Sequence, residues 1–277
     1  MAADTRFLKD ARGLPVPAGP YRRVVSLVPS LTDTVFGLGA GERLVGRTIY
    51  CAEPRGRVRG VPTFGGTKNP DVAGIIAAAP DLVLVCEEEN RREDVAALEA
   101  AGLKTFVVMP RSLDDVAQLL VDYGALLDAG PAAGRALSDL TAARLAAGKS
   151  RTARDEPPGV AVLIWKKPWM AVGGGNHINA MLGELGLRNV CGDRKGYPAL
   201  TLESLAVLAP DLVLLPDEPF PFTHHDSWSL AAADVVASRR QAVLLDGKLL
   251  SWYGTRTARS LRTLVNLLDG IAKGRNR

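Results

Sequence analysis

Aromatic side chains gather where the predicted strands of this sequence end. The chain has 277 residues, with only four tryptophans, five tyrosines and six phenylalanines. Core filling explains rings in loops poorly, because loops are exposed. Flat apolar walls with a few polar groups suit a large, partly planar ligand, so the pattern predicts a binding site. The rings at or just after predicted strands are Tyr50, Phe64, Trp165, Trp169, Tyr197, Phe220, Phe222, Trp252 and Tyr253.

Charged side chains near these rings could orient the polar groups of a ligand. Three acids, Glu87, Glu88 and Glu89, directly follow a predicted strand. Such a run is typical of a solvated loop or of a helix start, where acids interact favourably with the helix dipole; the alternative is that they accept hydrogen bonds from a ligand. Core packing is likewise the alternative for some of the rings. The predicted ligand-binding residues are Tyr50, Phe64, Glu87, Glu88, Trp165, Lys166, Tyr197, Phe222, Trp252, Tyr253 and Arg256.

Two side chains near strand ends, Ser30 and Cys86, could instead serve as nucleophiles of a cytosolic enzyme. No Gly-x-Ser-x-Gly elbow surrounds Ser30, and no histidine lies in the first half of the chain. We therefore expect Ser30 to cap a helix over residues 31–38, with Asp33 in the capping-box position. No base is positioned by sequence for either candidate, so a non-enzymatic protein is predicted.

A metal centre is the next alternative. His224, His225 and Asp226 are adjacent, but neighbouring residues rarely converge on one ion without ligands from elsewhere. His177 is the only other histidine. The sequence therefore predicts no resident metal and no intrinsic cofactor, and a bare metal-ion receptor remains a less favoured alternative.

A repeated pattern organises the elements that carry these residues. Residues 78–85 (AAPDLVLV) recur as residues 208–215 (LAPDLVLL), each combining a helix end, a Pro-Asp turn and a hydrophobic strand. Between the copies, Pro131 opens a stretch with helical periodicity that runs to about Ala153. The predicted fold is α/β, with two Rossmann-like lobes that have central parallel sheets and are joined by a single long helix. The predicted boundaries are 1–130 for the N-terminal lobe, 131–155 for the connecting helix and 156–277 for the C-terminal lobe.

Periodicity and turn residues predict the elements of each lobe. Strands are expected over 24–28, 44–50, 82–85 and 105–108, and then over 160–165, 212–215 and 242–245. Helices are expected over 31–38, 72–78, 92–101 and 113–127, and a long helix closes the chain.

Composition excludes several classes of protein. The net charge is +4, but Lys and Arg are scattered and form no stripe for nucleic acid. The spacing of Cys51, Cys86 and Cys191 matches no zinc motif, so buried free thiols are expected. No window is long and apolar enough for a membrane span. The first 20 residues lack the apolar core of a secretory signal, so the protein is cytoplasmic or has lost a leader.

Several motifs together resemble the class III substrate-binding proteins of ABC importers, which bind cobalamin, siderophores or haem. They are residues 23–32 (RVVSLVPSLT), Val45-Gly46, Tyr50, Pro54, Gly65-Gly66 and residues 80–83 (PDLV). The resemblance covers about residues 14 to 270. It implies a monomer that holds its ligand in a cleft between lobes that move little, in the periplasm or at the cell surface. It also implies an ABC permease as partner.

Within this family the chain is most similar to the cobalamin-binding receptors. Tyr50, Phe64 and Tyr197 fall where those receptors carry aromatic cleft residues. The expected function is therefore to hold a cobalamin-like corrinoid for delivery to an ABC importer. A ferric-siderophore or haem receptor of the same fold is the alternative, and some motifs also resemble a further branch of the family.

The resemblance also implies permease-docking residues. Glu203 falls where the receptors carry the glutamate of the second lobe that docks on permease arginines. In the first lobe Ala73 stands at the docking position, and Asp71 is the nearest carboxylate. A second departure is Cys86, which stands where a cleft tryptophan would follow the strand.

Overall fold

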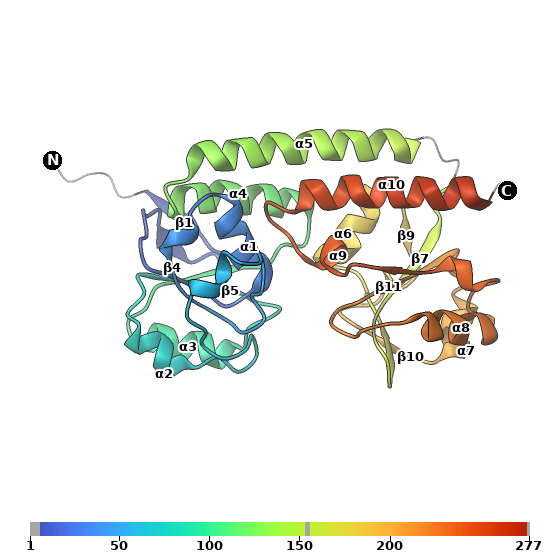
Figure 1. The fold of residues 1–277 in the computed structure, drawn as a ribbon, viewed down its shortest axis with the longest axis horizontal. Helices are drawn as coiled ribbons and strands as arrows, with labels where there is room; N and C mark the ends of the chain where they lie inside the picture. The colour runs from blue at the N-terminus through green and yellow to red at the C-terminus, as the bar shows by residue number, and fades with distance from the viewer. Residues whose placement is uncertain (1–5, 153–155, 276–277) are drawn as a thin grey trace. The chain divides into compact units, whose positions relative to one another are not determined.

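The computed structural model describes residues 6–152 and 156–275, which fall into two compact units (Figure 1). The first unit comprises the chain up to residue 110, residues 114–139 and residues 253–256. The second comprises residues 111–113, residues 140–252 and the chain from residue 257. The predicted end of the helical pattern near Ala153 and the predicted boundary of the connecting helix at residue 155 lie outside the described residues.

A four-stranded sheet forms the centre of the first unit, and all of its neighbouring strands pair in parallel. Its order is β4 (Leu44–Arg47), β3 (Val24–Ser26), β5 (Leu82–Cys86) and β6 (Thr105–Val108). Every residue of β3 and β5 is buried. Strands covered on both faces need apolar side chains throughout, which explains the continuous hydrophobic runs in the sequence here. A small antiparallel hairpin, β1 (Phe7–Lys9) and β2 (Pro15–Pro17), precedes the sheet.

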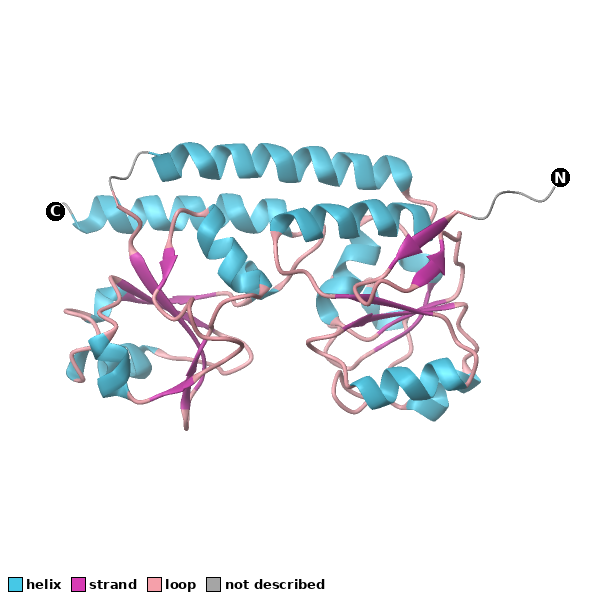
Figure 2. Ribbon diagram, turned by 180° about the vertical axis from the view of Figure 1, so that it is seen from behind, coloured by secondary structure: helices cyan, strands magenta, loops and turns pink. Residues whose placement is uncertain are grey.

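Helices cover both faces of this sheet. They are α1 (Pro29–Gly37), α2 (Val72–Ala77), α3 (Arg92–Ala100) and α4 (Leu113–Leu126), with the short turns η1 (Gly41–Arg43) and η2 (Val58–Gly60). Figures 1 and 2 show α2 and α3 on one face and α1 and α4 on the other. The core under α2 and α3 contains Val25, Leu27, Ile75, Val83, Val85, Val95, Leu98 and Val107.

The predicted role of Ser30 as a helix cap is wrong. Helix α1 begins at Pro29, its N-cap is Val28, and no side chain caps it. Proline at the first helical position has a suitable φ and lacks an amide hydrogen that would need a partner, so it moves the start upstream. Ser30 therefore lies inside the first turn, where it is 2% exposed.

A six-stranded sheet forms the second unit, with the order β10 (Ala199–Leu200), β8 (Trp169–Ala171), β7 (Gly159–Trp165), β11 (Leu212–Pro216) and β12 (Ala242–Leu245). Strand β9 (Arg188–Asn189) also pairs with β7. The predicted strands β7, β11 and β12 pair in parallel, as expected, and β9 pairs in parallel with β7. Strand β9 and the antiparallel edge formed by β8 and β10 were not predicted. The helical elements are α6 (His177–Glu184), α7 (Leu202–Val207), α8 (His224–Ala232), η3 (Arg239–Gln241), α9 (Lys248–Ser251) and α10 (Thr257–Arg275).

The long helix α5 (Gly130–Thr152) links the units and has Pro131 as its second residue. Its residues up to Asp139 count with the first unit and those from Leu140 with the second. Together with the sheets, it confirms the predicted α/β fold of two lobes joined by a long helix. Across residues 6–152 and 156–275, the structure contains no helix with the length and apolar character required to cross a membrane.

The repeat seen in the sequence is present in the structure. Ala79 before β5 and Ala209 before β11 both adopt positive φ values, 46° and 44°. Asp81 accepts hydrogen bonds from the two backbone amides before β3 at 2.7 and 2.9 Å. Asp211 accepts one from the amide of Gly159, at the start of β7, at 2.7 Å. The Pro-Asp turn therefore joins two neighbouring strands in the same way in each unit.

Candidate ligand-binding surfaces

Tyr50 lies on the loop that follows β4 in the first unit, and it is 59% exposed. Its ring lies against Gly66, because a Cβ added there would come within 3.0 Å of Tyr50 Cε2. The amide of Ile49 donates to the carbonyl of Gly65 at 2.9 Å, which joins the two loops. Tyr50 therefore presents an exposed ring at the carboxyl edge of a parallel sheet, the edge at which open α/β sheets bind ligands.

Arg47, the last residue of β4, holds the Tyr50 loop in place. Its Nε donates to the carbonyls of Val58 and Val61, and its Nη1 donates to those of Thr48 and Cys51, each at 3.1 Å. Sequence reasoning missed this residue. An arginine at a strand end carries no special signal, since the carbonyls that it binds come together only when the loop folds.

Phe64 packs partly into the core of the first unit and is half-buried. A Cβ added to Gly46 would come within 2.4 Å of Phe64 Cε2, so the ring occupies the space that this glycine leaves. The structure thus gives Phe64 a core role, the alternative that the sequence left open.

The acidic turn after β5 is tied to neighbouring elements. The Glu87 carboxylate pairs with Arg92, the first residue of α3, at 3.0 Å. The Lys68 ammonium donates to the carbonyl of Glu88 at 2.8 Å, which connects this turn to the loop after Phe64.

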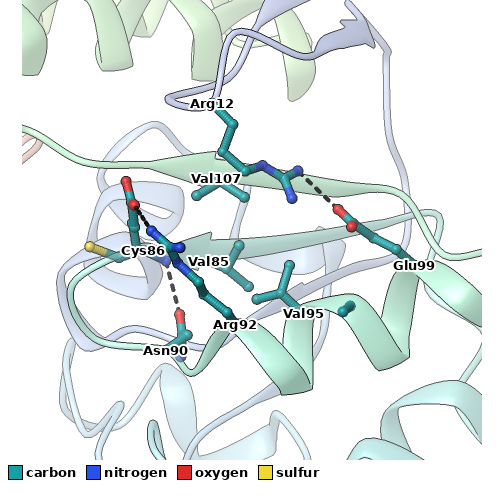
Figure 3. Close-up of a pocket in the computed structure, with 10 residues that line it drawn as sticks. Arg12, Val85, Cys86, Asn90, Arg92, Val95, Glu99 and Val107 are labelled. Atoms are coloured by element: carbon teal, nitrogen blue, oxygen red, sulfur yellow. Dashed lines mark hydrogen bonds and ion pairs between the residues drawn. The ribbon is translucent and has the colours of Figure 1, made fainter.

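A cavity of about 340 Å³ lies beside the acidic turn (Figure 3). Its apolar wall comes from β5, β6 and α3. Its lining also contains two ion pairs. The pairs are Arg12 with Glu99 at 2.9 Å and Arg92 with Glu87 at 3.0 Å. Glu87 is the one predicted ligand residue among its lining groups, which are Arg12, Val85, Cys86, Glu87, Asn90, Arg92, Val95, Ala96, Glu99 and Val107.

The segment 253–256 belongs to the first unit although it comes late in the chain. Tyr253 is 4% exposed, and burial raises its pKa well above the usual value. Arg256 makes a bidentate ion pair with Asp33 of α1, in which its Nη2 and Nε donate to the two carboxylate oxygens at 2.8 and 3.1 Å. A Cβ added to Gly254 would clash with Thr34, so the backbone of this segment lies directly against α1. Asp33, the expected capping-box residue, thus anchors Arg256.

Burial makes the cysteines poor nucleophiles. All three thiols are free and buried, which confirms that prediction. Burial, with a smaller contribution from Glu89, raises the pKa of Cys86 to about 11. About one Cys86 side chain in a thousand is then a thiolate at pH 8, and the thiolate is the reactive form.

We therefore predict that the three thiols resist a thiol reagent in the native protein. With dithiobis(nitrobenzoate) at pH 8, the reaction should be at least about 100-fold slower than in denaturant, because reagent access requires local unfolding. The release of thionitrobenzoate measures both rates. A single thiol reacting as fast in native as in denatured protein would contradict this prediction.

In the second unit, an aromatic cluster stands at the carboxyl ends of β7 and β11. Trp165 is 42% exposed and packs edge-on against Phe220, with ring centroids 5.6 Å apart. Phe220 contacts Phe222 at 4.7 Å, and Phe222 stacks on Trp169 at 6.0 Å. The Trp165 ring is therefore exposed to solvent and also packs on Phe220, the first of three further rings that contact one another in turn.

Lys166 is held inside this cluster. Its ammonium lies 2.5 Å from the Asp226 carboxylate and 4.9 Å from the centroid of the Trp169 ring. Asp226 also accepts hydrogen bonds from the amide and hydroxyl of Thr223, at 2.8 and 3.1 Å, and so caps α8. The Lys166 charge is thus neutralised by a buried partner.

Three of the predicted ligand-binding rings are buried rather than exposed. Phe222 belongs to the core of the second unit at 6% exposure. Trp252, at 8%, donates its indole hydrogen to Glu218 at 2.9 Å, and Tyr253 is buried as described above. For these three, the expectation that rings in loops are exposed is wrong. The loops fold back over the ends of the sheets, so their rings become part of the buried core. Tyr197 is half-buried.

No group of three or more His, Cys, Asp and Glu side chains among the described residues could hold a metal ion. His224 and His225 are exposed at the start of α8. Burial lowers the pKa of His177 to about 4, so this side chain is neutral at pH 7.

The predicted docking carboxylates lie on corresponding helices of the two units. Asp71 is the N-cap of α2 and accepts the amide of Gly74 at 2.9 Å. Glu203 is exposed in the first turn of α7. Each helix immediately precedes the Pro-Asp turn of its unit.

Comparison with known proteins decides the family. Residues 24–232 match the family model described as periplasmic binding protein. The chain belongs to the periplasmic binding protein family. It is therefore a solute-binding protein of an ABC importer and not an enzyme, with a ligand and a permease as partners.

Of three proteins that resemble the chain, one has no ligand in its name and the other two have different ones. It is 28% identical to an uncharacterized ABC transporter substrate-binding lipoprotein, YvrC, of Bacillus subtilis, over 75% of this chain and 68% of that protein. It is 24% identical to the vitamin B12-binding protein of Yersinia pestis (strain Pestoides F), over 73% and 72%. The periplasmic heme-binding protein RhuT from Roseiflexus sp. RS-1, in apo form, aligns with a TM-score of 0.76 and 25% identity, over 91% and 99%.

Proposed function

We propose that this protein binds a cobalamin-like corrinoid through the aromatic loops of both units and delivers it to an ABC importer, in the periplasm or at the cell surface. The observation that carries the proposal is an exposed ring at a carboxyl edge in each unit, Tyr50 in the first and Trp165 in the second. Similarity to a vitamin B12-binding protein supports the corrinoid.

Energetics are compatible with tight binding. Apolar area removed from water is worth about 25 cal/mol per Å². Nanomolar affinity requires about 12 kcal/mol net of the cost of association, which a large flat ligand covered by several side chains can supply.

Gel filtration after incubation with coloured ligands tests this proposal. Cyanocobalamin, hemin and a ferric hydroxamate siderophore are each mixed with the protein, and absorbance is followed across the protein peak. The proposal predicts that the corrinoid spectrum elutes with the protein. If only another chelate elutes there, or if none does, the corrinoid proposal is contradicted.

A haem receptor is the second candidate, and the exposed phenol of Tyr50 favours it, because tyrosine can ligate haem iron. Tyr50→Phe separates the two ligands. The variant should keep its corrinoid affinity, since the ring face remains. For haem it should lose the absorbance bands that arise from a phenolate ligand.

We further propose that Glu203 docks on the permease, with Asp71 making a smaller contribution because it already caps α2. Glu203→Lys should leave ligand affinity unchanged while reducing ligand-dependent ATP hydrolysis by the reconstituted importer at least about tenfold, since like charges would meet at the interface. Asp193→Lys, an exposed site elsewhere in the same unit, is the control. Equal losses in both variants would refute a docking role for Glu203.

A further inference from the structure

Asn90 joins three backbone segments at the carboxyl edge of the first sheet. It is 5% exposed, and its Oδ1 accepts the amide of Cys86 at 2.9 Å (Figure 3). Its Nδ2 donates to the carbonyl of Thr67 at 3.0 Å and to that of Leu27 at 3.3 Å. Leu27 follows β3, Cys86 ends β5, and Thr67 lies in the loop after Phe64. One buried amide thus ties this loop to the two central strands.

The loop that Asn90 holds is the one that supports Tyr50. Thr67 directly follows Gly66, against which the Tyr50 ring lies. Gly65 accepts the amide of Ile49, the residue before Tyr50, at 2.9 Å. A shift of the loop at Thr67 would therefore change both the surface under the ring and the backbone that carries it.

We propose that Asn90 is a positioning residue for Tyr50, acting through residues 65–67. This inference rests on the proposed function, in which the exposed ring of Tyr50 contacts the ligand. Aspartate at position 90 would still accept the Cys86 amide but could donate to neither carbonyl, so the loop would lose its buried link to the strands.

The second unit supplies a matched control. Asn189 accepts the amide of Cys191 at 3.0 Å and donates to the carbonyls of Val172 and Gly173 at 3.1 and 3.2 Å. It also donates to Oδ1 of Asn179 at 3.0 Å. It lies in β9, which pairs with the first residues of β7, at the end of its sheet opposite to the carboxyl ends. Asn189→Asp therefore removes the same kinds of bond away from the proposed ligand surface.

The experiment compares Asn90→Asp with Asn189→Asp in the full chain, with cyanocobalamin as the probe. We expect both variants to lower the thermal midpoint. Only Asn90→Asp should weaken binding, by about tenfold, because the Tyr50 loop loses both hydrogen bonds that Asn90 donates. Only Asn90→Asp should also accelerate hydrogen exchange at the amides of Ile49 and Gly66. Unchanged exchange at these amides would overturn the proposal.

A double-mutant cycle tests whether Asn90 acts through the ring. In a Tyr50→Ala background, Asn90→Asp should cause no further loss of affinity, whereas additive losses would overturn the proposed route. If the aspartate variant does not fold, Asn90→Ser removes the same donors without adding a charge. If the wild-type protein binds no cyanocobalamin, the proposed function fails, and the exchange rates still decide whether Asn90 positions the Tyr50 loop.

Discussion

Replacing Asp226 with alanine is expected to lower the free energy of unfolding of the second unit by about 3 kcal/mol, because removing one partner of a buried ion pair leaves the other charge uncompensated. The Asp226 side chain is 6% exposed and that of Lys166 is 21% exposed. The substitution also removes the cap of α8 that Asp226 forms with Thr223.

Tryptophan fluorescence during urea unfolding measures this effect selectively, since all four tryptophans lie in the second unit. The control is Asp246→Ala, which removes a half-exposed carboxylate 3.9 Å from Lys248. A pair of this kind is worth less than about 1 kcal/mol. Equal destabilisation by both variants would show that burial of the Lys166 pair has no special energetic role.

The difference in stability between the wild type and Asp226→Ala should also depend on pH. Burial alone would raise the pKa of Asp226, but the hydrogen bonds from Lys166 and Thr223 lower it overall. Stabilisation by this carboxylate is therefore complete above its unfolded pKa of about 3.9 and is lost as the pH falls through the lower folded value. Wild type and Asp226→Ala should converge in stability at low pH. A difference that stays constant between pH 7 and pH 3 would contradict this assignment.

Replacing Tyr50 and Trp165 together with alanine should weaken ligand binding about 100-fold. If the ligand covers roughly 60 Å² of each ring, each contributes about 1.5 kcal/mol, or about tenfold in affinity. Trp165 is the ring of the second unit chosen for this double variant because it is exposed, whereas Trp252, another predicted ligand residue, is buried. Titration calorimetry with the ligand identified by gel filtration gives the two affinities.

Trp228→Ala is the matched control for this pair. Trp228 is also largely exposed, at 56%, but it lies on α8, where Arg239 covers its ring at 4.4 Å. The variant should bind ligand like the wild type. A loss as large as that of the double variant would mean that exposed rings matter in general, and the carboxyl-edge assignment would fail.

Much of the fold could be predicted from sequence because its strongest signals are local. A continuous apolar run after a Pro-Asp turn, as at β5 and β11, fits a strand buried on both faces. The repeat of that pattern predicted two similar units, and Pro131 marked the start of α5 within one residue. The antiparallel strands β8 and β10 were missed, since strands of two or three residues contain too little periodicity to detect.

The candidate surface was harder to predict because exposure is not a local property. Tyr50 and Phe222 both follow strands, yet one is 59% exposed and the other 6%. Which ring becomes core depends on how each loop folds back, and that depends on residues distant in sequence. Arg47 and Asn90 determine two of these loops through bonds to backbone carbonyls, which any sequence provides. Side chains of this kind can be recognised only in the folded protein.

Isothermal titration of the purified protein with cyanocobalamin decides whether a corrinoid is the ligand. We expect saturable binding of one corrinoid per chain with a dissociation constant below about 1 μM, equivalent to more than about 8 kcal/mol. Absence of binding at ligand concentrations of about 100 μM, where a receptor of this kind should be saturated, would contradict the corrinoid assignment.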